Sequence, residues 1–488
     1  MLKILIPLLL LIFIVSCSVG PDYVKPTIEM PDSTFLMTDY TVEDSLALAL
    51  ADTSWWELFG DTVLTYLIKT AVQENNDIKI AAANVDEFMG LYGVAKSDFF
   101  PKFNVDVDGR IGENNAQGVQ FRSNRFTVDL STFWEIDIWG KIRRANEAAL
   151  ANLYASEEVR RGIILTITSQ VALAYFDLLS LDSQLEIAKQ TVDSRAYSLK
   201  LFDDRWQHGD ISRIEISQLE SEYWYAVAQI PYLEKNIVQL ENALSVLLGR
   251  NPGPIPRGKI LNDLTVPDIP ESLPSELLER RPDVLQAEQQ LISANANIGV
   301  IKSQYYPSLS LTGLIGYSTD DISTLFDPTS LVWSVGGNIL QPLFRAGEIS
   351  NQVESAEAVQ RQALYNYMKT VQTAFSDAQN SLIERVKTEE IYFADGKRLG
   401  ALQLYYDLAQ MKYNEGATSY LEVLDAERNL FNSQLGYAQS RATVLKSVVT
   451  IFSSLAGGWL NQLSYEAYQP MDPVVEQPQT ETKTEENK

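Results

Sequence analysis

The stretch GVAKSDFFPKFNVDVDGRI, residues 93–111, decides the fold because it joins a repeated motif to an alternating segment. Its first part, GVAKSDFFP at 93–101, recurs as GVIKSQYYP at 299–307. Similarly, RWQHGDISRIE at 205–215 is matched by KYNEGATSYLE at 412–422. Two halves of roughly 200 residues therefore share one plan, and this period is far longer than that of a solenoid repeat. Each half is predicted to be a unit of several helices and strands.

Apolar and polar residues alternate in two segments of each half. The segments cover 103–111 and 126–138 in the first half, and 309–317 and 331–339 in the second. A period of two predicts strands, with polar loops expected between them at 113–123 and 319–329. One apolar and one polar face over about 9–11 residues is typical of a membrane barrel. A half-buried strand of a soluble sandwich would alternate as well.

The polar face of the first pair of strands would line a water-filled lumen. It carries five carboxylates, namely Asp106, Asp108, Asp129, Glu135 and Asp137. Together they predict an acidic lumen. For any one of them, simple solvation is the alternative interpretation.

Most of the remaining sequence is predicted to be helical. Two long pairs are expected, 140–204 with 210–248 and 345–412 with 418–456. Apolar residues recur in several of these segments at alternating spacings of three and four, and such heptads drive helices to supercoil around partners. A helix of about 65 residues would be roughly 100 Å long.

Two details of the heptads carry expectations of their own. Pro231 lies inside the seam of the second helix and is expected to kink or break it. The seam of the last helix is read as Leu421, Leu424 and Phe431, with Arg428 as its one interruption.

The membrane makes the strands and the helices depend on each other. Four strands per chain cannot close a barrel, because single-chain barrels start at about eight strands. An open edge in lipid is forbidden, since each unpaired backbone group costs several kcal/mol. Three chains would supply about twelve strands around a water-filled lumen, and the heptads would join their helices side by side. The sequence therefore predicts a homotrimer.

The N-terminal stretch MLKILIPLLLLIFIVSC, residues 1–17, has a lysine followed by an apolar run. The run is too short to span a bilayer as a helix and is typical of an export signal. Its end resembles a bacterial lipobox, which predicts lipidation of Cys17. An ordinary secretory signal with a chance cysteine is the alternative. No later stretch is expected to approach a transmembrane helix.

Composition excludes several classes of function. The net charge of −25 argues against binding to nucleic acid, because phosphates are bound by Lys and Arg. The chain has one histidine, His208, and one cysteine. Histidine-based catalysis and metal sites therefore have almost no material, and we expect neither an enzyme nor a cofactor.

Several blocks of sequence resemble one known family in their order along the chain. They are CSVGPDYVKP at 17–26, WWELFGD at 55–61, LLGRNPG at 247–253, YLEVLDAERNLF at 420–431 and the long run LPSELLERRPDVLQAEQQLISANANIGVIKSQYYPSLSLTGLIGY at 273–317. Together they resemble the TolC-like outer-membrane efflux family, in particular its NodT-type lipoproteins.

This resemblance implies an α+β membrane protein: a trimeric twelve-stranded barrel continued by a long periplasmic coiled-coil barrel, with a mixed equatorial domain. It implies a passive exit duct for drugs and other small toxic compounds. It also implies contact with outer-membrane lipid, a periplasmic adaptor protein and an inner-membrane pump, commonly of the resistance-nodulation-division type.

The resemblance also assigns a periplasmic gate near the turns at Gly209 and Gly416. It implies that Glu422 and Asp425 form acidic rings and that Leu421 is an apolar constriction. Tyr413 would hold the helices shut, with Glu215 as its partner. Thr418 replaces an arginine latch of some members. Exposed coiled-coil residues are the alternative interpretation of the two acids.

The predicted domain boundaries follow from these parts. They are a signal peptide at 1–16, a lipidated N-terminus with equatorial segment and first helices at 17–98, a first hairpin at 99–139, a first helical pair at 140–256, a linker with an equatorial and helical segment at 257–304, a second hairpin at 305–343, a second helical pair at 344–460, and an equatorial end with a disordered acidic tail at 461–488. Two further functions stay open: a duct for type I protein secretion, and a structural coiled-coil lipoprotein without a channel.

Overall fold

The computed structural model describes residues 18–27, 54–116, 119–268 and 275–455. Cys17, the signal peptide at 1–16 and the tail at 461–488 lie outside the described residues. The long elements, in chain order, are α3 (Thr62–Glu74), α4 (Asn76–Ser97), β1 (Lys102–Ala116), β2 (Val119–Ile136), α5 (Lys141–Gln207), α6 (Arg213–Leu247), α7 (Pro282–Lys302), β3 (Ser308–Thr319), β4 (Leu331–Leu340), α8 (Glu348–Asn414) and α9 (Tyr420–Leu455). Short 3-10 turns connect them, the first being η1 (Trp55–Phe59).

The four strands form one antiparallel sheet in the order β1-β2-β3-β4. Asp106 pairs with Asp129, and Val107 pairs with Val128, so the register keeps the polar residues of β1 and β2 on one face. Among the residues that the structure describes, β1 and β4 have a neighbouring strand on one side only. The two hairpins are therefore joined side by side, and both outer edges of the sheet are open.

The first hairpin is longer than the alternation indicated. The expected loop at 113–123 is wrong, because pairing continues to Ala116 opposite Val119. The hydrophobic alternation ends near Ile111, whereas the ladder of backbone hydrogen bonds does not depend on the polarity of the side chains. The apolar pattern of the side chains therefore ends before the strand does.

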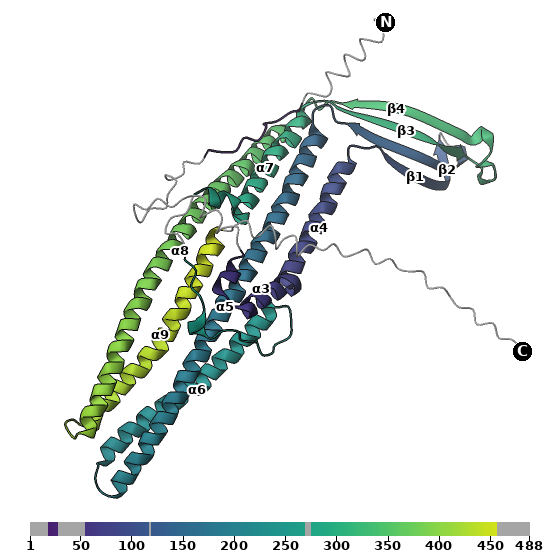
Figure 1. The fold of residues 1–488 in the computed structure, drawn as a ribbon. Helices are drawn as coiled ribbons and strands as arrows, with labels where there is room; N and C mark the ends of the chain where they lie inside the picture. The colour runs from purple at the N-terminus through teal and green to yellow at the C-terminus, as the bar shows by residue number, and fades with distance from the viewer. Residues whose placement is uncertain (1–17, 28–53, 117–118, 269–274, 456–488) are drawn as a thin grey trace, which may run out of the picture.

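The long helices run from the sheet to two separate turns at the far end of the molecule (Figure 1). α5 and α8 have 67 residues each, which corresponds to roughly 100 Å. Both end before a glycine in the left-handed region, Gly209 at φ 83° and Gly416 at φ 73°. A glycine adopts this conformation without steric cost and terminates the helix. The sequence repeat is thus visible as a structural repeat.

Two expectations about single helices are corrected. The break expected at Pro231 is wrong, because α6 continues through this residue as one helix, and the kink stays a prediction. The seam residues Ala226 and Leu233 on either side of Pro231 are buried, and α6 packs against α5. Part of α5 is apolar and long enough to cross a membrane by composition, contrary to the sequence expectation, but 56% of that stretch is buried inside the protein.

The first turns of the α9 seam differ from the sequence prediction at two positions, where Tyr420 takes the place of Leu421 and Glu427 that of Arg428. Tyr420, Leu424 and Phe431 are buried, whereas Leu421 is 57% exposed. The interruption of the seam is therefore Glu427, whose side chain is 12% exposed, and Arg428 lies on the outer face with its side chain 51% exposed.

The largest core lies midway along the long helices. The aromatic residues of η1, Trp55, Trp56 and Phe59, are fully buried there against α3, α5 and α9. Asp61 begins α3 by accepting hydrogen bonds from the backbone N–H groups of Val63 and Leu64. This core holds the connecting segments to the long helices at the level of the predicted equatorial domain.

Residues 18–27 form a strap along α7. The Val19 amide donates to the Trp139 carbonyl at 2.9 Å, at the base of the first hairpin. Further along, the Asn295 amide donates to the Pro21 carbonyl, also at 2.9 Å. A Cβ atom at Gly20 would lie 2.5 Å from the Gly299 Cα atom, so this crossing requires glycine. The residue that follows Cys17 is thus fixed beside the sheet.

Candidate channel lumen and gate

One face of the sheet is apolar and exposed along its length. Val107 is 74% exposed and Val335 is 81% exposed, and Trp333 and Ile339 are similar. In a soluble sandwich this face would pack on a second sheet, and the described residues form one sheet. Contact with lipid explains the exposure.

The opposite face carries charge in two layers. Asp106 and Asp129 lie directly opposite each other, and Asp106 accepts a hydrogen bond from the Ser131 hydroxyl at 2.7 Å. Two residues further along β1, the Asp108 carboxylate lies 3.7 Å from the Arg110 guanidinium. Arg110 is in turn opposite Arg125. The polar face is therefore acidic towards the helices and basic towards the hairpin tip.

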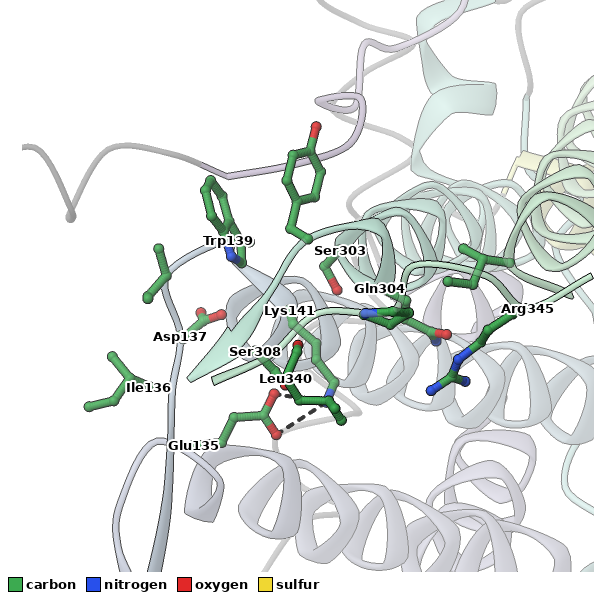
Figure 2. Close-up of a pocket in the computed structure, with 14 residues that line it drawn as sticks. Glu135, Ile136, Asp137, Trp139, Lys141, Ser303, Gln304, Ser308, Leu340 and Arg345 are labelled. Atoms are coloured by element: carbon green, nitrogen blue, oxygen red, sulfur yellow. Dashed lines mark hydrogen bonds and ion pairs between the residues drawn. The ribbon is translucent and has the colours of Figure 1, made fainter. Parts of the chain in front are cut away.

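The last two carboxylates lie at the base of the sheet, beside a cavity of about 190 Å³. Figure 2 shows the Lys141 ammonium directed at Glu135, with a shortest distance of 2.9 Å. Asp137 lies beyond the end of β2. Its carboxylate accepts the backbone N–H groups of Ile142 and Arg143 and pairs with the Arg143 guanidinium at 3.1 Å. Asp137 therefore caps α5 and does not belong to the strand face.

An aromatic pair lies at the same level. The rings of Trp139 and Tyr306 stack with their centroids 4.8 Å apart, and the Trp139 indole N–H donates to the Pro307 carbonyl at 2.9 Å. Trp and Tyr with one polar and one apolar end favour the boundary between membrane and water. The base of the sheet thus has the composition of a membrane interface.

The predicted gate residues lie in the first two turns of α9, at the far end of the molecule. Leu421 is exposed, and Glu422 accepts a hydrogen bond from the Thr418 hydroxyl. Asp425 pairs with Arg428 at 2.7 Å, and both side chains are about half exposed. The structure thus places Glu422 and Asp425 together at the start of α9. It also places Arg428 beside Asp425, whereas the sequence analysis assigned Arg428 to the seam.

The predicted pairing of Tyr413 with Glu215 is not formed within the protomer. The Tyr413 hydroxyl accepts a hydrogen bond from the Arg205 guanidinium at 2.9 Å. Glu215 instead forms a capping box with Ser212 at the start of α6. A Ser followed three residues later by Glu is a capping signal, and the sequence analysis overlooked it.

Aromatic residues join the helix ends near the turns. Tyr420 of α9 lies between Phe202 of α5, at 4.0 Å between ring centroids, and Tyr413 of α8, at 5.1 Å. Burial raises the pKa of the Tyr420 hydroxyl above its ordinary range. These rings connect the two helical hairpins at the predicted gate, since Tyr413 belongs to it and Tyr420 directly precedes Leu421.

Among the described residues, no group of three or more His, Cys, Asp or Glu side chains could hold a metal ion.

The sequence matches the outer membrane efflux protein family over residues 67–250 and 273–457. The chain is 31% identical over 460 residues to the solvent efflux pump outer membrane protein SrpC of Pseudomonas putida, which covers 93% of this chain and 98% of the relative. It is 30% identical over 457 residues to the cation efflux system protein CusC of Escherichia coli O6:H1, with coverage of 93% and 98%.

The structure is similar to the open state of the Neisseria gonorrhoeae MtrE outer membrane channel. The TM-score is 0.82 at 26% identity, over 91% of this chain and 99% of the channel. The predicted fold class is confirmed, with a mostly helical protomer that contributes four strands to a channel. Efflux across the outer membrane is confirmed as its function, which excludes a coiled-coil lipoprotein without a channel. The chain belongs to the outer membrane efflux protein family.

Proposed function

We propose that three copies of this chain close into one barrel and form the exit duct of a tripartite efflux pump. The observation that carries this proposal is the sheet with two open edges, β1 and β4. About five residues of each edge strand would point both backbone groups into lipid. At several kcal/mol for each unpaired group, the open edges would cost tens of kcal/mol, and pairing β4 of one copy with β1 of the next removes that cost.

The duct would work with a periplasmic adaptor and an inner-membrane pump. A passive channel supplies no energy for transport, so a separate pump must drive the cargo. A pump of the resistance-nodulation-division type fits the family resemblance. The relatives' names refer to solvents and to cations, and we propose drugs and other small toxic compounds as cargo here. A deletion strain should become more susceptible to such compounds.

We further propose that Cys17 carries the lipid anchor. Its neighbour Ser18 lies against Gly140, at the junction of sheet and helix, and Val19 is bonded to Trp139. Acyl chains attached at this point would enter the periplasmic leaflet of the outer membrane beside the barrel. Anchor and barrel would then insert at the same depth.

The gate of this duct would be the three-fold ring of Leu421, Glu422 and Asp425. Three features support it: these residues lie at the helix ends farthest from the sheet, they are exposed or partly exposed in the protomer, and each would appear three times around one axis. Rings of carboxylates attract cations, and they repel one another when a pore is narrow.

The assembly is tested with the purified lipoprotein in detergent and in planar bilayers. We expect a trimer by light scattering and stepwise ionic currents after insertion. A stable, well-folded monomer in detergent would refute the closure argument. A trimer that inserts without any current would refute the duct.

A further inference from the structure

A buried arginine joins three long helices about one turn above the predicted gate. The side chain of Arg195, on α5, is fully buried. Its Nε atom donates to the Glu427 carboxylate of α9 at 3.1 Å, and its Nη1 atom donates to the Glu222 carbonyl of α6 at 2.5 Å. The guanidinium also lies over the Phe431 ring at 5.4 Å. Arg195 is thus the centre of a polar contact between the two helical hairpins.

The cluster carries two carboxylates for one guanidinium. The Glu222 carboxylate lies 3.4 Å from Arg195 Nη1, and both acids are at most one-fifth exposed. From α8, the Tyr406 side chain faces Glu427 as well. Burial raises the pKa of Glu427 above its ordinary value, and Arg195 opposes that rise. Loss of Arg195 would leave both acids without their cation, which is costly, whereas loss of one acid would leave the other paired with Arg195.

The direction of Glu427 connects this cluster to the gate. Residues two apart on a helix point to nearly opposite sides. Glu427 therefore faces α5 and α6, while Asp425 faces outward from the same turn of α9. A movement of the start of α9 away from α5 and α6 would carry the acidic ring with it and would also separate Glu427 from Arg195.

We propose that Arg195 is a positioning residue of the gate: through Glu427 it ties the start of α9 to α5 and α6 and thereby holds Leu421, Glu422 and Asp425 in the closed arrangement. This inference rests on the proposed duct and its gate. Glu222 has a different part, because it belongs to the same helical hairpin as Arg195 and does not connect that hairpin to α9.

The difference between the two acids gives a matched experiment. Glu427→Met removes the tie to α9 and leaves Arg195 paired with Glu222, which protects folding. Glu222→Met removes an equally buried carboxylate and leaves the tie. Glu427→Gln keeps an oxygen that can accept the Arg195 hydrogen bond. Each variant is purified as a trimer, its thermal denaturation is recorded, and its resting conductance is measured in planar bilayers.

We expect Glu427→Met to raise the resting conductance by about tenfold, which corresponds to about 1.4 kcal/mol. The charge-assisted hydrogen bond that ties α9 to Arg195 is lost in this variant, and such a bond is worth at least that much. Glu222→Met and Glu427→Gln should keep the conductance of the wild type. Equal conductance of all variants and the wild type would overturn the inference, as would an equal rise in Glu222→Met and Glu427→Met. Absence of current even from the wild type would remove the proposed duct and this inference with it.

Discussion

Arg428 makes the proposed gate less acidic than its carboxylates alone would suggest. In each protomer it pairs with Asp425 at 2.7 Å. Glu422 is the other charged side chain that we assign to the ring, whereas Glu427 faces the buried Arg195 and is paired with it. Each protomer therefore brings a net charge of about one negative unit to the ring, counted from two acids and one base. Replacing Arg428 with alanine would double that charge.

The effect of this doubling can be derived from Coulomb's law. Repulsion within a symmetric ring grows with the square of the charge per protomer, so Arg428→Ala should raise the electrostatic repulsion about fourfold. The Asp425–Arg428 pair itself is half exposed and contributes about 1 kcal/mol or less to folding. The variant should therefore fold as a trimer, while its closed gate becomes less favourable.

The double variant Glu422→Ala with Asp425→Ala is the matched comparison. It leaves Arg428 alone, so the ring changes sign at about the same magnitude of charge. In planar bilayers under a salt gradient, we expect Arg428→Ala to increase both the resting current and the cation preference. The double variant should prefer anions. Because salt screens charges beyond about 8 Å at physiological ionic strength, both shifts should weaken in concentrated salt. Reversal potentials identical to that of the wild type in both variants would refute the ring geometry.

Two further predictions concern the sheet and the buried acid. Val107→Arg places a charge on the exposed apolar face and should cost about 2–4 kcal/mol near the middle of the bilayer, so less trimer should assemble in membranes. Asp108→Arg places the same charge one residue further along, on the polar face, and this variant should assemble normally. Equal assembly of the two variants would contradict the assignment of the faces. Because the folded-state pKa of Glu427 is raised above 4.5, its contribution to stability is present at low pH and is lost as the pH rises through the folded pKa. The melting temperature of the wild type should therefore fall relative to that of Glu427→Gln as the pH rises above about 4.5, and a constant difference across pH would contradict this.

Periodicity alone predicted most of the architecture, because lipid and helix packing both select side chains by position. The strands were recognisable from the alternation of Phe103, Val105 and Val107, and the helix ends from the repeated Gly209 and Gly416 segments. These signals come from local sequence and need no knowledge of distant contacts. The common polar face of Asp106, Asp108 and Asp129 followed from the same alternation, and its position in a lumen stays a prediction.

The parts that could not be predicted depend on contacts between distant segments. Asp137 fitted the alternation of polar and apolar residues, yet it lies past the last paired residue of β2 and caps α5. A period of two in the sequence does not show where the pairing of a strand ends. Glu215 was assigned from family resemblance, whereas the capping box with Ser212 is a local competitor for its carboxylate. Pro231 was expected to disturb α6, and packing against α5 keeps the helix continuous.

The first turns of the α9 seam show why a difference of one residue position matters for function. Leu421 and Tyr420 are both apolar enough for a heptad position, so hydrophobicity does not choose between them. A seam that begins at Leu421 places Arg428 among the buried residues. The seam found in the structure begins at Tyr420 and places Glu427 there instead. Only the second has a buried partner of opposite charge, Arg195, and a cation placed beside Asp425 on the outer face. The buried Arg195 on a distant helix therefore accounts for Glu427 in the seam, and this leaves Asp425 and Arg428 on the face of α9 that could meet a pore.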